Sequence, residues 1–469
     1  MMQRFLMSRR TMLYSLVGML MTTMMALYGC GGSGSTGSGS YPDPTPTTTK
    51  SAAIIDASTL MAWINEGKLN APMAAKASAS GAVAVKSSAV LDRVVIVSPS
   101  TTADWTAKGH IPGAVRWGTD ETAMSRIEGL ALAANMMPNG PMMDGIIQRL
   151  GIDGNTTIVI SLPKNAGTSG LYSQSLIYWD LRYWGFPRER VKILNGGDDA
   201  WEAAGYTLST DATEKYTAST YSVKNNAALN EAFRYSIGDM ITKTNEIINN
   251  PKLKDEWQLL EVRGTATSPY ITNALRQPNA VMFLSRLNGD ATKNFVYPDK
   301  ATLISRMATL PVKDGTTDVY VSPTKKTIAM CGASTSASPS FVLFDAILEV
   351  PAGNIALYDG SASQWNNYST AYLSAKYTTA TPAQISLWSF NDTAITRTQL
   401  AAGTTWPIGT KDAKGNDITI SIWTADSPAL IPSHPDMNQI LKEDKAYMTP
   451  TGSSTSGGTT GGGSAPSGC

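Results

Sequence analysis

Residues 191–206, which read VKILNGGDDAWEAAGY, carry the clearest indication of the fold. A short apolar strand runs there into a pair of glycines, and a tryptophan-containing segment follows the turn. Two further strands come earlier, RVVIV at 93–97 and TIVI at 157–160, and an amphipathic helix is expected over 171–183. Strands that alternate with helices and short glycine turns are typical of a doubly wound α/β domain with a parallel sheet.

A second segment repeats this order of elements, which indicates an internal duplication. A strand and turn over residues 258–263 (QLLEVR) precede a short strand over 327–330 (TIAM), and that strand runs straight into CGASTSA at 331–337. Because the two segments share one plan, we expect two doubly wound α/β domains, one over residues 53–215 and one over 229–370.

The flanking segments have a different composition. Residues 30–52 and 449–469 are rich in Gly, Ser, Thr and Pro, and such segments cannot bury a core. Residues 371–448 are a C-terminal extension that we assign to neither domain. Within it, the alternation of DITISIW at 417–423 predicts a strand.

The first 29 residues have the layout of an export signal. A basic start is followed by an uncharged stretch of 17 residues over 11–27, and the stretch ends in LYGC at 27–30. This ending resembles the lipobox of bacterial lipoproteins, which implies that Cys30 is acylated and anchors the protein in the bacterial cell envelope. Gly31 rather than Asp follows that cysteine, and resemblance to enterobacterial lipoproteins then implies the outer membrane rather than the inner one. The alternative is an uncleaved transmembrane helix, for which the stretch is marginally short.

Composition excludes several classes of function. Charged residues make up 16% of the 469 residues, and loss of the leader's three basic residues takes the net charge from +1 to −2. Nucleic-acid binding needs a positive surplus, so we expect no nucleic-acid partner. The chain has two histidines and three cysteines, none of them in a CxxC pair. We therefore expect neither a metal nor a cofactor, and no disulfide-stapled fold.

Cys331 is the candidate nucleophile, because a thiolate attacks most readily where its charge is stabilised. A tight loop between a strand and a helix supplies inward-pointing backbone N–H groups and the positive end of the helix. Small residues follow the cysteine and let the backbone curl around the sulfur: Gly332, Ala333, Ser334, Thr335 and Ser336. The alternative is that Cys331 is a small buried hydrophobe, as free cysteines commonly are.

Four motifs resemble the rhodanese (sulfurtransferase) family. In the first segment they are GHIPGAV at 109–115 and, some eighty residues later, ILNGGDDAWEAAGY at 193–206. In the second they are LLEVR at 259–263 and YDGSASQW at 358–365. The resemblance implies tandem rhodanese-like domains around central parallel sheets.

The resemblance also implies an activity. Cys331 would accept a sulfane sulfur as a persulfide and pass it to cyanide or a thiol, so the partners are a small anionic sulfur donor and a thiol-type acceptor. The matching loop of the first domain, LPKNAGTS at 162–169, has no cysteine, which implies a catalytically silent domain. The uncharged CGASTSA loop is closer to mercaptopyruvate-type than to thiosulfate-type loops. Ala333 and Ser334 depart from that pattern, so both donors stay open.

Two residues outside the loop are candidates for substrate binding. His110 matches a histidine that the mercaptopyruvate-type enzymes are proposed to use, and the alternative is a structural histidine that fixes the turn before Pro112. Arg263 would hold an anionic substrate, and the alternative is that it pairs with Glu261.

A rival interpretation keeps the fold without the turnover. The protein would then be a rhodanese-like surface lipoprotein that serves as an interaction or assembly module of a cell-envelope complex, with an envelope protein as its partner. The departures in the Cys331 loop and the unmatched residues 371–448 favour this rival.

Overall fold

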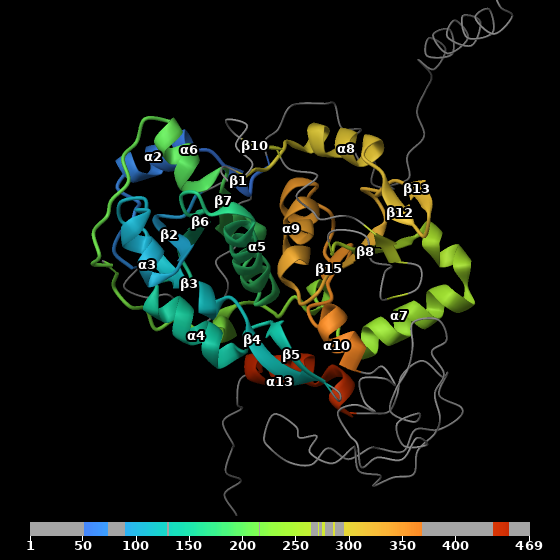
Figure 1. The fold of residues 1–469 in the computed structure, drawn as a ribbon. Coiled ribbons are helices and arrows are strands. Elements are labelled where there is room, and N and C mark those ends of the chain that lie inside the picture. Colours follow the sequence, from blue (N-terminus) through green and yellow to red (C-terminus); the bar gives the residue numbers. More distant parts are fainter. Residues whose placement is uncertain are drawn as a thin grey trace, which may run out of the picture. The chain divides into compact units, whose positions relative to one another are not determined.

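The structure is a computed structural model, and it describes residues 51–73, 90–128, 131–214, 216–263, 271, 274–276, 285–286, 295–367 and 435–449 (Figure 1). These residues belong to one compact unit, Thr48–Cys469, which is distinct from Met1–Thr47. The leader, the lipobox with Cys30 and the strand expected at 417–423 lie outside the described residues. No helix in the described ranges is long and apolar enough to cross a membrane.

The first half of the unit is built on a five-stranded sheet in which every neighbouring pair is parallel. Its strands, in order across the sheet, are β1 (Ile54–Ile55), β7 (Val191–Leu194), β6 (Thr156–Ile160), β2 (Arg93–Ser100) and β3 (Val115–Gly118). Its helices are α2 (Ala57–Asn65), α3 (Thr102–Ala107), α4 (Gly140–Arg149), α5 (Gly167–Tyr183) and α6 (Gly197–Ala203).

Side chains of β2 alternate between two apolar clusters. Val94 and Ile96 pack with residues of α2, α3 and α6, whereas Val95 and Val97 pack with residues of α4 and α5. All residues of β2 and β6 are buried. A parallel sheet is covered by helices on both faces, which explains the uninterrupted β-branched runs in its sequence.

The second half is built on a six-stranded sheet. Its order is β13 (Thr317–Val319), β12 (Val312–Asp314), β9 (Ala274–Arg276), β8 (Trp257–Glu261), β14 (Lys326–Met330) and β15 (Ile355–Leu357). The last four are mutually parallel, and β12 and β13 extend one edge in antiparallel fashion. Its helices are α7 (Ile237–Asn249), α8 (Lys300–Thr309), α9 (Ser338–Phe341), which continues as the π-helical turn η9 (Val342–Ile347), and α10 (Ser361–Asn367).

The two halves repeat one plan, with the order β7-β6-β2-β3 in the first matching β15-β14-β8-β9 in the second. Equivalent backbone bonds support the match. The N–H of Asp198 donates to the carbonyl of Leu162 (2.8 Å), and the N–H of Ala362 donates to the carbonyl of Cys331 (3.0 Å). Leu162 therefore stands where Cys331 stands in the second half. The predicted fold class, two α/β domains with parallel sheets, is confirmed.

Several smaller elements complete the two halves. The antiparallel hairpin of β4 (Met124–Glu128) and β5 (Ala131–Met136) belongs to the first half, and β10 (Ser285–Arg286) pairs with β11 (Phe295–Val296) in the second. Short 3-10 turns are η2 (Thr119–Glu121), η3 (Arg188–Arg190), η4 (Val223–Asn225), η5 (Glu231–Phe233), η6 (Pro251–Asp255) and η8 (Thr335–Ala337). Helices α5 and α9 pack against each other between the two sheets (Figure 1).

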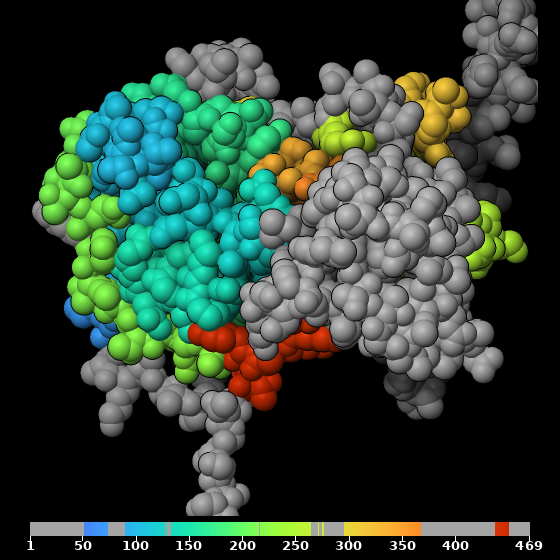
Figure 2. All heavy atoms as spheres, turned by 60° about the horizontal axis from the view of Figure 1, so that its bottom comes forward, coloured from blue at the N-terminus to red at the C-terminus, as the bar shows by residue number. Residues whose placement is uncertain are grey.

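The last described segment consists of η10 (Pro435–Asn438) and α13 (Gln439–Met448). Helix α13 packs on β4 and α4 of the first half, and η10 packs on α7 of the second. Figure 2 shows this segment, in red, beside the first half. The C-terminal extension, which the sequence assigned to neither domain, thus ends in a segment, η10 with α13, that lies against both.

Candidate functional site

Cys331 directly follows β14, a strand that lies between β8 and β15 in the second sheet. The N–H of Val262, just beyond β8, donates to the carbonyl of Met330 (2.9 Å), so β8 and β14 end side by side. Sites in α/β proteins form at the carboxyl edge of such parallel strands. The cysteine therefore occupies the edge of the sheet at which a ligand site is expected.

The loop after Cys331 turns back on itself at Ser334. Ser334 has φ 60° and ψ −40°, and the N–H of Thr335 donates to the carbonyl of Ala333 (2.7 Å), which closes a three-residue turn. A positive φ is uncommon for a residue with a side chain and marks backbone strain. Thr335 and Ser336 then begin η8, and both are partly exposed.

The hydroxyl of Ser361 accepts hydrogen bonds from two of the backbone N–H groups that the sequence places around the sulfur. Its Oγ accepts from the N–H of Cys331 (3.0 Å) and from the N–H of Ser334 (3.4 Å), and it donates to the carbonyl of Tyr358 (2.7 Å). Ser361 is fully buried at the start of α10. A hydroxyl 30 residues away in the chain thus competes with the thiol for two of the amides that the sequence places around it.

Three amides of the loop remain for an anion. The N–H groups of Gly332, Ala333 and Ser336 have no acceptor among the described residues, and all three residues are partly exposed. A Cβ placed on Gly332 would meet nothing within 4 Å, so there is open space beside the loop. Successive N–H groups of this kind make an anion-binding concavity.

The thiol itself is covered. Cys331 is 1% exposed and belongs to an apolar cluster with Ala337 and Phe341. Tyr172 of α5 lies near the Cys331 sulfur. Burial, and then the negative charge of a Cys331 thiolate, raise the pKa of Tyr172. Ser338 ties the same region together by donating to the carbonyl of Tyr172 (3.2 Å). A donor therefore reaches the sulfur only when this cover moves.

The first half also contacts the loop through its β4–β5 hairpin. The hydroxyl of Ser334 donates to the carbonyl of Asn135 in β5 (2.5 Å), and Asn135 has a positive φ of its own (58°). The Ser334 side chain is thus engaged in holding the loop to the other half. Sequence reasoning missed Asn135 and Tyr172, because nothing in the chain links positions so far apart.

His110 lies among residues of the first half. Its ring stacks on Trp105 at 3.6 Å with an interplanar angle of 10°, and its Nδ1 is 3.2 Å from the carbonyl of Trp105. Its backbone exchanges two hydrogen bonds with Ser209. Burial lowers the pKa of His110, which favours the neutral imidazole. These contacts favour the structural alternative for His110.

Arg263 pairs with Glu261 at the end of β8. Its Nε and Nη2 donate to the two carboxylate oxygens of Glu261 (2.9 and 3.0 Å), and its N–H donates to the same group (2.8 Å). Glu261 is fully buried, whereas the Arg263 side chain is 27% exposed. The structure therefore realises the pairing alternative, at the sheet edge that carries Cys331. Among the described residues, no group of three or more His, Cys, Asp or Glu side chains is placed to hold a metal ion.

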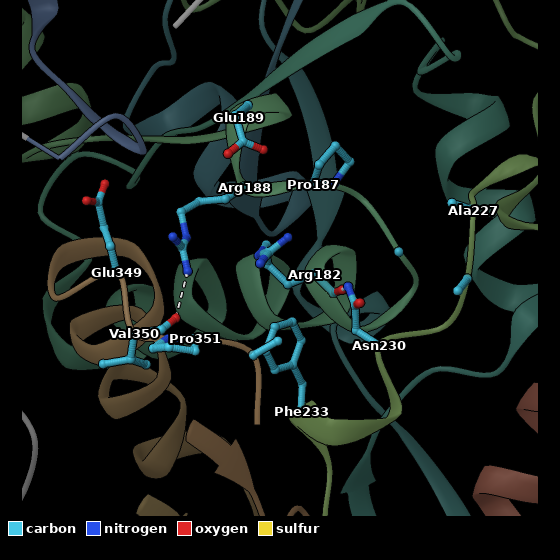
Figure 3. A pocket seen from close by; sticks show the side chains of 13 residues that line it. Arg182, Pro187, Arg188, Glu189, Ala227, Asn230, Phe233, Glu349, Val350 and Pro351 are labelled. Atoms are coloured by element: carbon cyan, nitrogen blue, oxygen red, sulfur yellow. Dashed lines mark hydrogen bonds between the residues drawn. The ribbon is translucent and has the colours of Figure 1, made fainter. Parts of the chain in front are cut away.

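A separate pocket of about 480 Å³ lies where the two halves and the segment between them meet (Figure 3). Arg182 and Arg188 line it, and both bind Asp345, which also accepts from the hydroxyl of Tyr178 (2.7 Å). Arg188 also reaches the carbonyl of Val350 (3.1 Å). No residue of the Cys331 loop lines this pocket, and the carboxylates of Glu189 and Glu349 offset its positive charge.

The chain was compared with known proteins, and its match among the curated ones is to a sulfurtransferase. No family model matches the chain. Among curated proteins, the chain is similar to thiosulfate/3-mercaptopyruvate sulfurtransferase 2 of Arabidopsis thaliana, with 28% identity over 119 residues. The match covers 24% of this chain and 32% of that protein, so this chain spans about a third of the relative's length.

Two solved structures are similar over most of their own length. Tum1 of Saccharomyces cerevisiae has 16% identity and a TM-score of 0.47, and the match covers 72% of this chain and 98% of Tum1. SseA of Escherichia coli, whose structure is described as a rhodanese fold of 3-mercaptopyruvate sulfotransferases, has 21% identity and a TM-score of 0.45, with coverage of 66% and 99%. The sequence match is thus to a thiosulfate/3-mercaptopyruvate sulfurtransferase, over a part of each chain.

Proposed function

We propose that the protein is a sulfurtransferase that works through a persulfide on Cys331. The observation that carries the proposal is the place of Cys331: it follows a central parallel strand directly and begins a tight loop whose Gly332 and Ala333 amides have no acceptor among the described residues. The matching position in the first half is Leu162, so only the second half has a nucleophile there.

The reaction has two displacements at sulfur. The Cys331 thiolate attacks the outer sulfur of thiosulfate, the S–S bond breaks, and sulfite leaves with the bonding electron pair. With 3-mercaptopyruvate, the Cys331 thiolate attacks the thiol sulfur, and the C–S bond breaks with its electron pair on carbon as the enolate of pyruvate. The enolate then takes up the proton that the thiol sulfur loses, which gives pyruvate. Cyanide or a thiolate then attacks the outer sulfur of the persulfide and restores the Cys331 thiolate.

The test compares wild type with Cys331→Ser in a thiocyanate-forming assay with each donor. We expect the variant to lose at least about two orders of magnitude in rate, because its hydroxyl is a far weaker nucleophile than a thiolate. Mass spectrometry of the donor-treated protein should show one added sulfur on the Cys331 peptide. Equal rates for the two proteins contradict the proposal.

One observation favours the rival function, a rhodanese-like interaction module of an envelope complex. The thiol is 1% exposed, and the amides of Cys331 and Ser334 are occupied by Ser361. The two functions differ in thiol reactivity. A live site labels with iodoacetamide at neutral pH faster than Cys469 in the tail, whereas an inert buried cysteine labels more slowly than Cys469.

We also propose that the protein is held in the bacterial cell envelope, at the outer membrane, by a lipid on Cys30. The support is the LYGC ending of the leader and the Gly that follows it. Cys30→Ser should abolish incorporation of labelled palmitate and move the protein from the membrane to the soluble envelope fraction. Continued labelling of that variant contradicts the anchor.

A further inference from the structure

Helix α13 is joined to the Cys331 loop by a run of buried hydrogen bonds and the short pieces of backbone between them, which begins at Asp444. This carboxylate, 1% exposed, accepts from Nη2 of Arg126 (2.9 Å) and from Nη1 of Arg126 (3.1 Å). Nη1 of Arg126 also donates to the carbonyl of Met137 (3.2 Å). One guanidinium thus binds the C-terminal helix to the chain that follows β5.

The run continues into the second half. The N–H of Met137 donates to Oδ2 of Asp359 (3.1 Å), and Oδ1 of Asp359 accepts from the N–H of Gly360 (3.0 Å). The next residue is Ser361, whose hydroxyl accepts from the N–H of Cys331. Met137, Asp359 and Ser361 are fully buried.

A second link passes through the hairpin itself. Arg126 lies on β4 opposite Ala133 on β5, and two residues later Asn135 presents its carbonyl to the hydroxyl of Ser334. The hairpin that Asp444 holds on one side therefore holds the Cys331 loop on the other. Both Asn135 and Ser334 have positive φ, so this contact joins the turn at Ser334 to a strand residue with an uncommon backbone conformation.

The docking of α13 is specific. The hydroxyl of Tyr183 also donates to Asp444 (3.0 Å), and Tyr447 donates to Asp144 of α4 (2.5 Å). A Cβ on Gly140 would come within 2.0 Å of the Tyr447 ring, so only glycine permits this close approach. Nη2 of Arg126 also binds Glu443 (3.1 Å), whose side chain is 35% exposed, so loss of the Asp444 charge leaves the buried guanidinium with a partly exposed partner. The groups that the buried pair orders then move.

We propose that Asp444 is a positioning residue for the Cys331 loop. By fixing Arg126 and the β4–β5 hairpin, it sets the orientation of the amides on which thiolate stabilisation depends. This role rests on the proposed function of Cys331, and it makes the end of the C-terminal extension a support of the site. The physical basis is a contiguous network, and its coupling is what the experiment measures.

The experiment compares Asp444→Asn with Lys445→Ala in the full-length protein. Lys445 is the next residue and makes an exposed pair with Glu231, both side chains being 52% exposed. Two quantities are measured: the rate of Cys331 alkylation by iodoacetamide from pH 5 to 9, read by mass spectrometry with Cys469 as reference, and kcat and KM for thiocyanate formation.

For Asp444→Asn we expect half-maximal alkylation at a higher pH and a kcat about 3- to 30-fold lower, with a smaller change in KM. A purely structural role lowers the unfolding midpoint and leaves the pH profile in place. Lys445→Ala should match wild type in every measurement.

A second variant keeps the test decisive if Asp444→Asn unfolds. Arg126→Lys retains a positive charge beside Asp444 but cannot also reach the carbonyl of Met137, so α13 stays docked and the run is cut. The double variant Asp444→Asn/Ser334→Ala should show less than the product of the two single effects.

Unchanged alkylation profiles in both Asp444→Asn and Arg126→Lys overturn the positioning role. Retained turnover in Cys331→Ser overturns the proposed function instead, while the alkylation data still report whether Asp444 positions the loop.

Discussion

Asp180 lies in α5 with both carboxyl oxygens buried and without a hydrogen-bond partner among the described residues. Burial, and then the negative charge of Asp359, raise the pKa of Asp180 well above its usual value. Asp359 instead accepts from Nε of Arg234 (2.8 Å), which also binds Glu128. The raised pKa of Asp180, which has no such cation in the described part of the chain, favours its neutral form.

The raised pKa of Asp180 predicts a free energy of unfolding that falls as the pH rises. The unfolded chain releases the proton of Asp180 near pH 4, whereas the folded chain keeps it to a higher pH. Between the two pKa values the unfolded state therefore binds fewer protons than the folded state, and the free energy of unfolding declines by about 1.4 kcal/mol per pH unit. Asp180→Asn has the same shape and does not titrate. In urea unfolding, its advantage over wild type should grow from pH 4 to pH 7. A difference that is constant with pH contradicts the assignment.

At the scale of elements, the strands were predictable because a doubly covered parallel sheet needs uninterrupted β-branched runs. The run predicted at 93–97 is the start of β2, which continues to Ser100, and the one at 327–330 is β14 with one residue added. The helix predicted over 171–183 begins earlier, at Gly167. Helix ends depend on caps and turns, which the apolar period does not report.

The position of the Cys331 loop was predictable, but its hydrogen bonds were not. Strand, cysteine and small residues are local features, whereas the acceptor of the loop amides is Ser361, 30 residues away. In the first half Gly197 occupies the equivalent place, with a similar positive φ (59° against 48° for Ser361), so the competing hydroxyl is peculiar to the second half. The role of α13 was beyond prediction for the same reason, since Arg126 and Asp444 are 318 residues apart.

At the scale of the whole molecule, the two halves are joined through a buried carboxylate. Asp345 on η9 accepts from Tyr178, Arg182 and Arg188 of the first half and is fully buried. Burial alone would raise the pKa of Asp345, but the charges and hydrogen bonds of the two arginines outweigh it, and the net pKa is lowered. Its contribution to stability is therefore present above the pKa of the unfolded chain and is lost as the pH falls through the lowered pKa.

Asp345→Asn should be among the most damaging single changes in the contact between the halves. It leaves the Arg182 and Arg188 guanidiniums facing a neutral amide, and breaking a buried pair in this way costs about 3–5 kcal/mol. Asp318→Asn is the matched control, because Asp318 pairs with Lys313 at the surface (side chains 56% and 41% exposed) and such pairs contribute about 0–1 kcal/mol. Urea unfolding at pH 7 measures both. Protonation of Asp345 lowers the free energy of unfolding of wild type below pH 4, whereas the raised pKa of Asp180 lowers it as the pH rises above 4. Asp345→Asn should therefore remove the loss of stability below pH 4 and leave the loss above pH 4 in place. A loss below pH 4 that persists in this variant would place the tie between the halves elsewhere.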